Sequence, residues 1–456
     1  RWATPCGLFL TNSVANTPAA LALERCMREQ FVIEGNHALH GEVTVSGNKN
    51  AALKMLPACL LTDEPVTLTN VPDIADVRVT LELLRRLGCE VDDLGDHRVR
   101  VHARDLTTHA LDPEMCVRTR ASIVFAGPML ARMGSVAFPP PGGDVIGRRR
   151  LDTHILALER LGTVVEFDGR FTMQTDGLRG ADILLDEASV TATENAVMAA
   201  VLARGTTILR NVASEPHVQN LCRMLNGMGA RVSGIGTNCL TIDGVEQLSG
   251  GEFRVEADYL EVVSLIGAAV VTGGEIRIRQ ADPQYLDMAA LMFHKLGVTW
   301  QVDGPDVIVP RGQALTIERD LGNQIPEIKA QPWPAFPSDM MSIALTVATQ
   351  SAGTVLFHEW MYNSRFFFTD KLSAMGARIF LCDPHRAVVH GPTVLRGISP
   401  ISSPDIRAGM ALLLAALCAR GTTTIRNIGQ IDRGYERVEE KLRGLGAVIR
   451  REPVAT

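Results

Sequence analysis

The chain has 456 residues, of which 46% are hydrophobic and 21% are charged, and its formal net charge is -6. This length predicts two or more domains, and the composition excludes an intrinsically disordered chain. Because the net charge is negative, the chain has no general attraction for nucleic acid or anionic membranes, and an anionic ligand would need a local group of basic residues.

The beginning of the chain fits none of the patterns found further on. Residues 1–30 begin without Met and lack the basic start and apolar core of a secretory signal, so we treat them as an N-terminal tail of unknown status. The nine cysteines are scattered and never form a C-x-x-C pair, which predicts free thiols in a reducing compartment. No stretch reaches the roughly 18 apolar residues of a membrane span. A cytoplasmic protein is therefore expected.

One unit of sequence recurs six times along the chain. Each copy has a short β-branched strand, a turn with Asn, Pro or Asp, an amphipathic helix, a glycine and another strand. The glycine is expected just beyond the helix, where positive φ lets the chain leave it. The six glycines are Gly88, Gly162, Gly229, Gly297, Gly376 and Gly446.

The helices of the unit are of two kinds. In the first copy Val77, Leu81, Leu84 and Leu87 draw one apolar stripe, which predicts a helix packed on one side. A second helix usually follows, as in the stretch 410–419, and it is apolar on nearly all sides. Such helices are expected to be buried.

The repeats predict an α/β protein. Their period, near 70 residues, is longer than the 20–50 residues usual for solenoids and propellers. It fits a small βαβ-type module better, and two sets of three modules would give two lobes with a cleft between them. Clefts between domains are preferred places for small-molecule sites.

The copies differ most in their strand-to-helix turns, where basic residues gather. In chain order these are Lys49 in SGNKNAA, the glycine-rich turn 142–154 with three arginines, Arg365 in NSRFFF, and 431–437, IDRGYER. Glycine backbone and arginine forks suit an oxyanion, although a charged surface loop or a solvated helix start would account for each turn alone. Repetition is expected to bring these turns to one end of each lobe.

Two carboxylates stand out in the second half of the chain. Asp339 lies in PWPAFPSDMM, where Ser338 or Asp339 would ordinarily cap a helix, and Asp405 in SSPDIRAG is another expected cap with Arg407 behind it. The P-loop, H-E-x-x-H, G-x-S-x-G and G-x-G-x-x-G motifs do not occur, and the histidines show no metal-ligand spacing. These absences remove the usual support for a kinase, a zinc protease, a hydrolase or a dinucleotide-binding enzyme.

Taken together, SGNKNAA, TRASIVFAGP, PPGGDVIGRRRLDTH, ASVTATENAVMAA, PAFPSDM and IDRGYER resemble the UDP-N-acetylglucosamine 1-carboxyvinyltransferase family, from about Phe31 to Arg451. The resemblance implies the inside-out α/β barrel fold of enolpyruvyl transferases, with two lobes of three units each. It also implies that residues 49–256 form one lobe, and that 31–48 with 257–456 form the other.

The resemblance places the family's roles on matching residues. Lys49, Arg149 and Arg433 match groups that hold phosphoenolpyruvate, and Arg365 and Arg407 match arginines near its carboxylate. Asn50 and Asp339 match sugar-binding residues, and Asp339 is the expected base for the sugar's 3-hydroxyl. The UDP-binding surface is matched by Arg120, Arg149, Asp152 and the segment 188–191, which includes Ser189 and Val190.

The implied reaction is addition of the hydroxyl to phosphoenolpyruvate followed by loss of phosphate, the committing step of peptidoglycan synthesis. The expected partners are phosphoenolpyruvate and UDP-N-acetylglucosamine, with no metal, organic cofactor, nucleic acid or membrane. Many members carry a cysteine where this chain has Asp144. Asp144 is therefore the hypothetical proton donor, and we expect insensitivity to fosfomycin because the alkylated thiol is missing.

Three smaller departures leave the acceptor open. Thr191 stands where glycine is expected, Tyr259 where arginine is expected, and Gln430 where histidine often precedes I-D-R-G-Y-E. An enolpyruvyl transferase with another nucleotide acceptor is therefore one alternative. A non-catalytic paralogue that binds a UDP-sugar is the other, although it would have no need for the phosphoenolpyruvate-binding cations.

Overall fold

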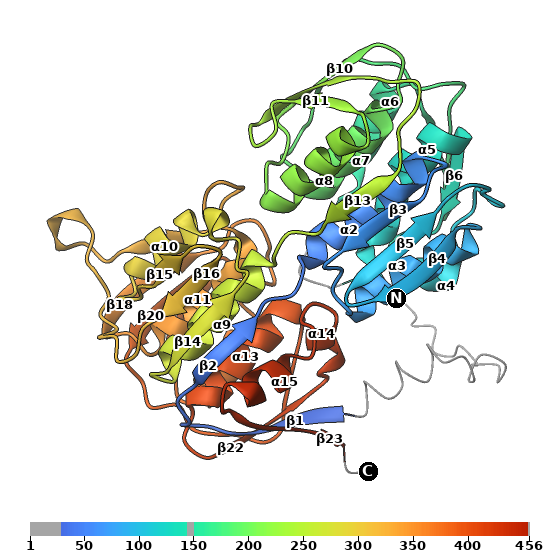
Figure 1. Ribbon diagram of the computed structural model, residues 1–456. Helices are drawn as coiled ribbons and strands as arrows, with labels where there is room; N and C mark the ends of the chain where they lie inside the picture. Colours follow the sequence, from blue (N-terminus) through green and yellow to red (C-terminus); the bar gives the residue numbers. More distant parts are fainter. Residues whose placement is uncertain (1–28, 144–149, 455–456) are drawn as a thin grey trace, which may run out of the picture.

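The computed structural model describes residues 29–143 and 150–454, and it divides into two lobes with separate hydrophobic cores (Figure 1). The core of one lobe is built from residues 31–45 and 257–449, so we call it the split lobe. The core of the other is built from residues 51–255, so we call it the continuous lobe. Strand β1 begins at Glu29, inside the stretch of residues 1–30 that the sequence analysis treated as a tail.

Each lobe contains three β-sheets. The sheets of the split lobe are β21(Ile401–Ser402)–β22(Thr422–Arg426)–β1(Glu29–Glu34)–β23(Val448–Pro453), β15(Gln301–Asp303)–β16(Asp306–Val309)–β14(Glu275–Arg279)–β2(His40–Thr44) and β17(Glu327–Lys329)–β18(Gly353–His358)–β20(Arg386–Gly391)–β19(Arg378–Asp383). Those of the continuous lobe are β11(Arg231–Ser233)–β12(Cys239–Asp243)–β10(Thr206–Arg210)–β9(Asp182–Leu184), β13(Gly251–Arg254)–β3(Val66–Thr69)–β5(Arg98–His102)–β4(Glu90–Gly95) and β6(Ser135–Phe138)–β8(Phe171–Gln174)–β7(Val164–Phe167).

The six sheets are variants of one pattern. In each four-stranded sheet a parallel pair is followed by two antiparallel pairings. The three-stranded sheet lacks the parallel strand, but a single parallel bridge between Ala110 and Ala137 lies in its place. All six glycines expected beyond a helix have positive φ, between 80° and 107°. The repeat seen in the sequence is therefore a structural unit.

Within the described residues, six helices lie in the cores. In the split lobe α9 (Tyr259–Val271), α11 (Met341–Ala348) and α13 (Ile406–Cys418) pack against one another in pairs, and nearly every residue of each is buried. The continuous lobe has α2 (Lys49–Ala58), α5 (Ala126–Met133) and α7 (Val190–Ala200), of which α5 and α7 pack together. The expectation of buried apolar helices is confirmed, including the stretch 410–419.

The remaining helices have one exposed side. They are α3 (Ala75–Arg86), α4 (Pro113–Cys116), α6 (Asp152–Arg160), α8 (Pro216–Gly227), α10 (Asp287–His294), α12 (Thr369–Ala374), α14 (Gly429–Asp432) and α15 (Val438–Gly444). Short 3₁₀ turns span Cys59–Leu61, Arg120–Phe125, Pro283–Tyr285, Leu321–Asn323 and Ser338–Met340. Within residues 29–143 and 150–454, no helix is long and apolar enough to span a membrane.

Two antiparallel segments connect the lobes. Asn48 donates its backbone N–H to the carbonyl of Glu256 at 2.7 Å, and Asp258 donates to the carbonyl of Ser46 at 2.9 Å. Between them lies Gly47, where a Cβ atom would stand 1.7 Å from the carbonyl oxygen of Asn70, so only glycine fits. The chain therefore crosses between the lobes twice at one place.

The two connecting segments also supply the residues that cap two buried helices, α2 and α9. The carboxylate of Asp258 accepts from Leu260 N–H at 2.9 Å, which caps α9, and from Lys49 N–H at 3.3 Å in the first turn of α2. Asn48 caps α2 by accepting from Ala51 N–H at 2.9 Å. Lys49 is thus fixed where the lobes meet, at a position that directs its side chain between them.

Candidate active site

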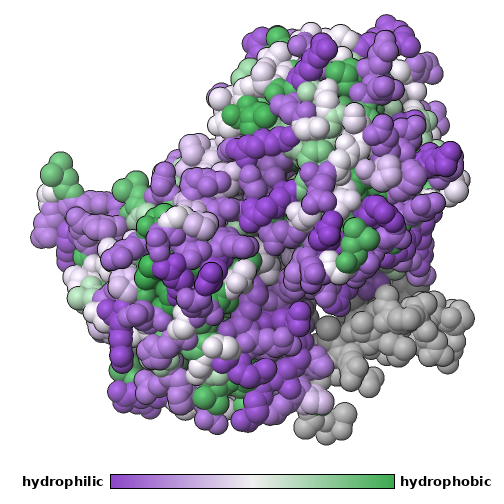
Figure 2. Space-filling model, in the orientation of Figure 1, coloured by the Kyte–Doolittle hydropathy of each residue, from purple (hydrophilic) through white to green (hydrophobic). Residues whose placement is uncertain are grey.

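A polar pocket lies between the two lobes. The continuous lobe contributes residues from α2, α3, the Arg120–Phe125 turn and α7. The split lobe contributes residues from the Ser338–Met340 turn, from the start of α13 and from neighbouring turns. On the face shown in Figure 2, hydrophilic residues fill the groove between the lobes, and hydrophobic ones form small separate patches. The lining residues are Lys49, Asn50, Leu53, Lys54, Asp76, Thr119, Arg120, Ala121, Thr191, Asp339, Arg365, Asp405, Ile406, Arg407 and Arg433.

One group of charges in the pocket crosses between the lobes; we call Lys49, Asp76 and Arg433 the Asp76 cluster. The buried carboxylate of Asp76 accepts from Lys49 Nζ at 2.9 Å and from Arg433 Nε at 2.9 Å. Burial would raise the pKa of Asp76, but the two cations outweigh it and lower that pKa. Since Arg433 belongs to the split lobe, Asp76 holds the lobes together by an ion pair.

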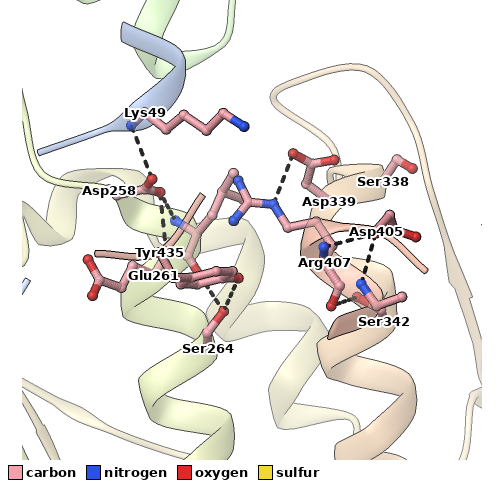
Figure 3. Close-up of polar contacts among 12 residues, drawn as sticks. Lys49, Asp258, Glu261, Ser264, Ser338, Asp339, Ser342, Asp405, Arg407 and Tyr435 are labelled. Atoms are coloured by element: carbon pink, nitrogen blue, oxygen red, sulfur yellow. Dashed lines mark hydrogen bonds and ion pairs between the residues drawn. The ribbon is translucent and has the colours of Figure 1, made fainter. Parts of the chain in front are cut away.

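The second group lies wholly within the split lobe; we call Asp339, Arg365 and Arg407 the Asp339 cluster. Arg365 Nη2 lies 2.5 Å from one carboxylate oxygen of Asp339. Arg407 Nε lies 3.3 Å from the other oxygen, a contact that Figure 3 shows. Burial would raise the pKa of the Asp339 carboxyl, but the arginines hold it far below its usual value. Asp339 is therefore ionised throughout the physiological range.

The arginines of this cluster are themselves held by their surroundings. Arg407 lies over the ring of Tyr435 at 5.3 Å, and the Tyr435 hydroxyl is hydrogen-bonded to Ser264 at 2.8 Å (Figure 3). Arg365 Nε donates to the Ser338 hydroxyl at 3.2 Å. Arg407 Nη1 is buried and has no hydrogen-bond partner among the described residues. A buried guanidinium donor without a partner is suited to receive a ligand oxygen.

The two expected helix caps differ in outcome. Asp405 caps α13, accepting from Arg407 N–H at 2.9 Å and Ala408 N–H at 3.0 Å, as the sequence predicted. Neither Ser338 nor Asp339 acts as a cap, because Ser338 donates to Glu359 at 2.5 Å and Asp339 pairs with the arginines. The ordinary interpretation of Asp339 as a cap is therefore wrong.

Most of the residues proposed from the sequence meet in this pocket. Those that line it are Lys49, Asn50, Arg120, Asp339, Arg365, Arg407 and Arg433. Asp152 does not line it and lies instead in a surface hollow with Glu159, paired with Arg150 at 2.9 Å. Ser189 and Val190 are not among the lining residues either, although Thr191 beside them is. Asp144 and Arg149 lie outside the described residues.

The three departures from the family pattern have structural partners. Thr191 is hydrogen-bonded to the buried ring of His154 at 3.0 Å, and Gln430 accepts from Arg433 Nη1 at 3.1 Å. Tyr259 is buried against the rings of Tyr285 and Trp333 at the start of α9, and it is not among the residues that line the pocket. Thr191 and Gln430 thus touch the site or its cations, whereas Tyr259 supports the crossing between lobes.

Two charged residues of the pocket were missed by sequence reasoning. Asp76 was passed over because an acidic residue in the first turn of a helix is ordinarily explained by the helix dipole. Lys54 was passed over because it follows Lys49 in the same apolar helix. The available clue for Asp76 was its place in a strand-to-helix turn, which is where the basic residues were found. Its burial depends on packing, which the sequence does not display.

The described residues contain no group of three or more His, Cys, Asp or Glu placed to hold a metal ion. Their seven cysteines are all free. Cys116 lies beside the start of the glycine-rich loop, where its carbonyl accepts from Gly142 N–H at 3.1 Å. Its thiol is fully buried, and burial raises its pKa to about 12, so it is not a reactive nucleophile.

Comparison with known proteins agrees with this geometry. Residues 33–442 match the EPSP synthase (3-phosphoshikimate 1-carboxyvinyltransferase) family. The chain is 54% identical over 424 residues to a UDP-N-acetylglucosamine 1-carboxyvinyltransferase of Bradyrhizobium diazoefficiens, covering 93% of this chain and 98% of that one. It is also 54% identical to the protein of that name from Treponema pallidum, and the match covers 92% of this chain and 99% of that one.

Solved structures are similar over more than nine-tenths of the chain. The enolpyruvyl transferase NikO from Streptomyces tendae superimposes with a TM-score of 0.83 at 25% identity, covering 94% of this chain and 99% of that one. An EPSP synthase from Acinetobacter baumannii superimposes with a TM-score of 0.73 at 17% identity, covering 93% and 100%. The second likeness concerns the fold alone.

Proposed function

The chain belongs to the EPSP synthase family and, within it, to the UDP-N-acetylglucosamine 1-carboxyvinyltransferases, and we propose that it transfers the enolpyruvyl group of phosphoenolpyruvate to the 3-hydroxyl of UDP-N-acetylglucosamine. Phosphate is released, and the product commits the sugar nucleotide to peptidoglycan synthesis. The substrates are small molecules, and the scheme needs no metal or organic cofactor.

The observation that carries this proposal is the arrangement of charges in the pocket. Two carboxylates each pair with two cations there, which leaves an excess of positive charge: Asp76 pairs with Lys49 and Arg433, and Asp339 pairs with Arg365 and Arg407. Phosphoenolpyruvate also carries two anionic groups, a phosphate and a carboxylate. Its binding to the two pairs of cations would replace internal partners by substrate, so the site is organised before the substrate arrives.

The proposed reaction explains how Asp339 becomes a base. Between two arginines its pKa is too low for it to accept a proton efficiently. When the substrate carboxylate draws Arg365 and Arg407 toward itself, that pKa rises, and Asp339 takes the proton of the 3-hydroxyl. The oxygen adds to C2 while C3 gains a proton, and the tetrahedral adduct then loses phosphate from C2 and a proton from C3. Lys49 and Arg433 stabilise the departing phosphate.

Asp144 is proposed to supply the proton to C3 in place of the cysteine of many relatives. A carboxylic acid there must be protonated when the substrate arrives, and a closed site holding an anionic substrate favours that form. Fosfomycin, which alkylates the thiol, would then have no target, because Cys116, whose carbonyl accepts from Gly142 N–H, has a buried and unreactive thiol. Time-dependent inactivation by fosfomycin, or full activity of Asp144→Asn, would contradict this part of the proposal.

The fold supports further assignments that we propose from the family. The buried helices and the sheets of each lobe are consistent with an inside-out α/β barrel of three units. The lobes would comprise residues 49–256 and residues 31–48 with 257–456, with the UDP-binding surface formed by Arg120, Arg149, Asp152 and residues 188–191. The expected location is the cytoplasm, where both substrates are available.

The test is release of phosphate from phosphoenolpyruvate with and without UDP-N-acetylglucosamine. We expect release only when the sugar nucleotide is present, together with a product heavier by one enolpyruvyl group. If phosphate release instead requires a different nucleotide acceptor, the result would favour an enolpyruvyl transferase with another acceptor, the alternative suggested by Thr191. Binding of UDP-N-acetylglucosamine without any phosphate release would favour a regulatory protein.

A further inference from the structure

Lys54 is a second lysine of helix α2 that lines the pocket. Its side chain is almost completely buried, yet the pocket wall includes it together with Lys49 and Asn50. Residues four apart lie on one face of a helix, so Lys54 stands one turn beyond Asn50. Lys49, five residues earlier, points about 140° away around the axis. Lys54 therefore shares the side of the pocket that Asn50 occupies.

The carboxyl group that contacts Lys54 belongs to Glu194, which lies outside the pocket lining. Its Nζ atom lies 3.4 Å from Oε2 of Glu194 on α7, and Glu194 is completely buried and does not line the pocket. Neither carboxylate oxygen of Glu194 has a hydrogen-bond partner among the described residues. Burial raises the pKa of Glu194 to about 8, and Lys54 offsets only part of that rise. Glu194 thus anchors Lys54 by a long, loose ion pair.

This arrangement differs from that of the other cations. Lys49, Arg433, Arg365 and Arg407 pair with carboxylates that themselves face the pocket, so an anionic ligand can take the place of those carboxylates. The carboxyl group beside Lys54 belongs to Glu194, which does not line the pocket and cannot be displaced by a ligand. An ammonium group has three donors, and Glu194 engages one side only. Lys54 therefore offers N–H donors to a ligand on the side of the pocket that Asn50, which matches a sugar-binding residue, also occupies.

We propose that Lys54 is a specificity-determining residue that donates a hydrogen bond to a neutral oxygen of the acceptor sugar, a hydroxyl or the acyl carbonyl, with Glu194 as its positioning residue. This inference rests on the proposed function, because the acceptor is the sugar nucleotide named there. The donor substrate is held by the other four cations, and its binding does not involve Lys54.

The experiment is steady-state phosphate release by the wild-type protein and by Lys54→Met, Lys54→Arg and Glu194→Gln. Loss of a hydrogen bond from a charged donor is expected to raise KM for UDP-N-acetylglucosamine about tenfold to a hundredfold in Lys54→Met. The KM for phosphoenolpyruvate should change little, Lys54→Arg should restore most of the affinity, and Glu194→Gln should raise only the acceptor KM. Lys295→Met is the control, because Lys295 pairs with Asp320 at 2.7 Å and is not among the residues lining the pocket.

The outcomes separate this inference from the proposed function. If the wild-type protein releases no phosphate with UDP-N-acetylglucosamine, the proposed function fails. If it does, and folded Lys54→Met keeps the wild-type acceptor KM, the inference alone is overturned. A rise in the phosphoenolpyruvate KM without a rise in the acceptor KM also overturns it. With UDP-glucose as acceptor, an effect of Lys54→Met equal to that seen with UDP-N-acetylglucosamine assigns the hydroxyl, and a smaller one assigns the acyl carbonyl.

Discussion

The Asp76 and Asp339 clusters have the same composition, one carboxylate between two cations, but they are attached to the fold differently. Asp339 and both of its arginines belong to the split lobe, so their contacts do not depend on how the lobes are placed. Asp76 and Lys49 belong to the continuous lobe, whereas Arg433 comes from the other. The Asp76 cluster is complete only when the lobes meet.

This difference separates two tasks that the pocket must perform. A cluster within one lobe keeps its geometry when the two lobes move relative to each other. This suits the residue that exchanges a proton with the substrate. A cluster shared between lobes couples ligand charge to the distance between them, which suits closure around a substrate. Substitutions at the two carboxylates should therefore affect different measurements.

The largest effect is expected for Asp339→Asn. Loss of the base should lower kcat about 10²–10⁴-fold in the phosphate-release assay, because proton transfer by a positioned side chain contributes that much. Binding of UDP-N-acetylglucosamine, measured by calorimetry, should persist. Asp370→Asn, at an exposed carboxylate paired with Lys371, is the matched control and should retain activity. Wild-type kcat in Asp339→Asn would show that another group takes the proton.

The next effect concerns closure of the lobes. Asp76→Asn leaves Lys49 and Arg433 facing each other without their shared carboxylate, which should shift the substrate-free protein toward an open form by up to about 3–5 kcal/mol. Small-angle scattering should give a larger radius of gyration for Asp76→Asn than for the wild type, but not for Asp339→Asn. Phosphoenolpyruvate with UDP-N-acetylglucosamine should reverse the change, because substrate phosphate replaces the carboxylate. Equal radii for all three proteins would contradict a role in closure.

A third buried carboxyl group, that of Glu194, can be compared with Asp76 and Asp339. It has one lysine as its partner, whereas each of the other two has two cations. Burial raises the pKa of Glu194 to about 8, above the value of about 4.5 expected in the unfolded chain. The folded state then binds more protons than the unfolded state between those values, so stability falls as pH rises, by at most about 1.4 kcal/mol per pH unit. Urea unfolding of Glu194→Gln should lack this loss between about pH 5 and 8, and identical slopes for both proteins would contradict it.

The pH dependence at Asp339 has the opposite sign. Its pKa in the folded protein lies below that of the unfolded chain, so its contribution to stability is complete above about pH 4 and is lost as pH falls further. The stability difference between the wild type and Asp339→Asn, measured by denaturant unfolding, should shrink below about pH 4. A difference that stays constant from pH 7 to pH 3 would mean that Asp339 does not gain stability from its arginines.

The smallest effect is expected at the edge of the Asp76 cluster. Gln430 contributes one hydrogen bond to Arg433, so Gln430→Ala should cost about 0.5–1.5 kcal/mol of binding, or no more than about tenfold in the KM for phosphoenolpyruvate. The KM of Gln430→His should lie between those of the wild type and Gln430→Ala. A larger loss than that of Asp76→Asn would show that Gln430, and not Asp76, positions Arg433.

Much of this molecule could be predicted from the sequence because its information is local. The six glycines beyond helices, the apolar helix 410–419 and the cap at Asp405 each depend on neighbours a few residues away, and the structure confirms all three. The basic residues of the strand-to-helix turns could be found by the same means, since repetition places equivalent turns at equivalent positions.

The tertiary structure alone decided how those residues are paired. Asp76 and Arg433 are 357 residues apart, and Lys54 and Glu194 come from different repeats, so no periodicity links them. Asp339 looks like a helix cap in the sequence because capping is a local interaction, but two arginines 26 and 68 residues further along the chain bind its carboxylate. Sequence specifies which side chains are charged. Only folding decides which of them are buried together, because burial and the resulting Coulomb interactions depend on distances that are set by packing across lobes and repeats.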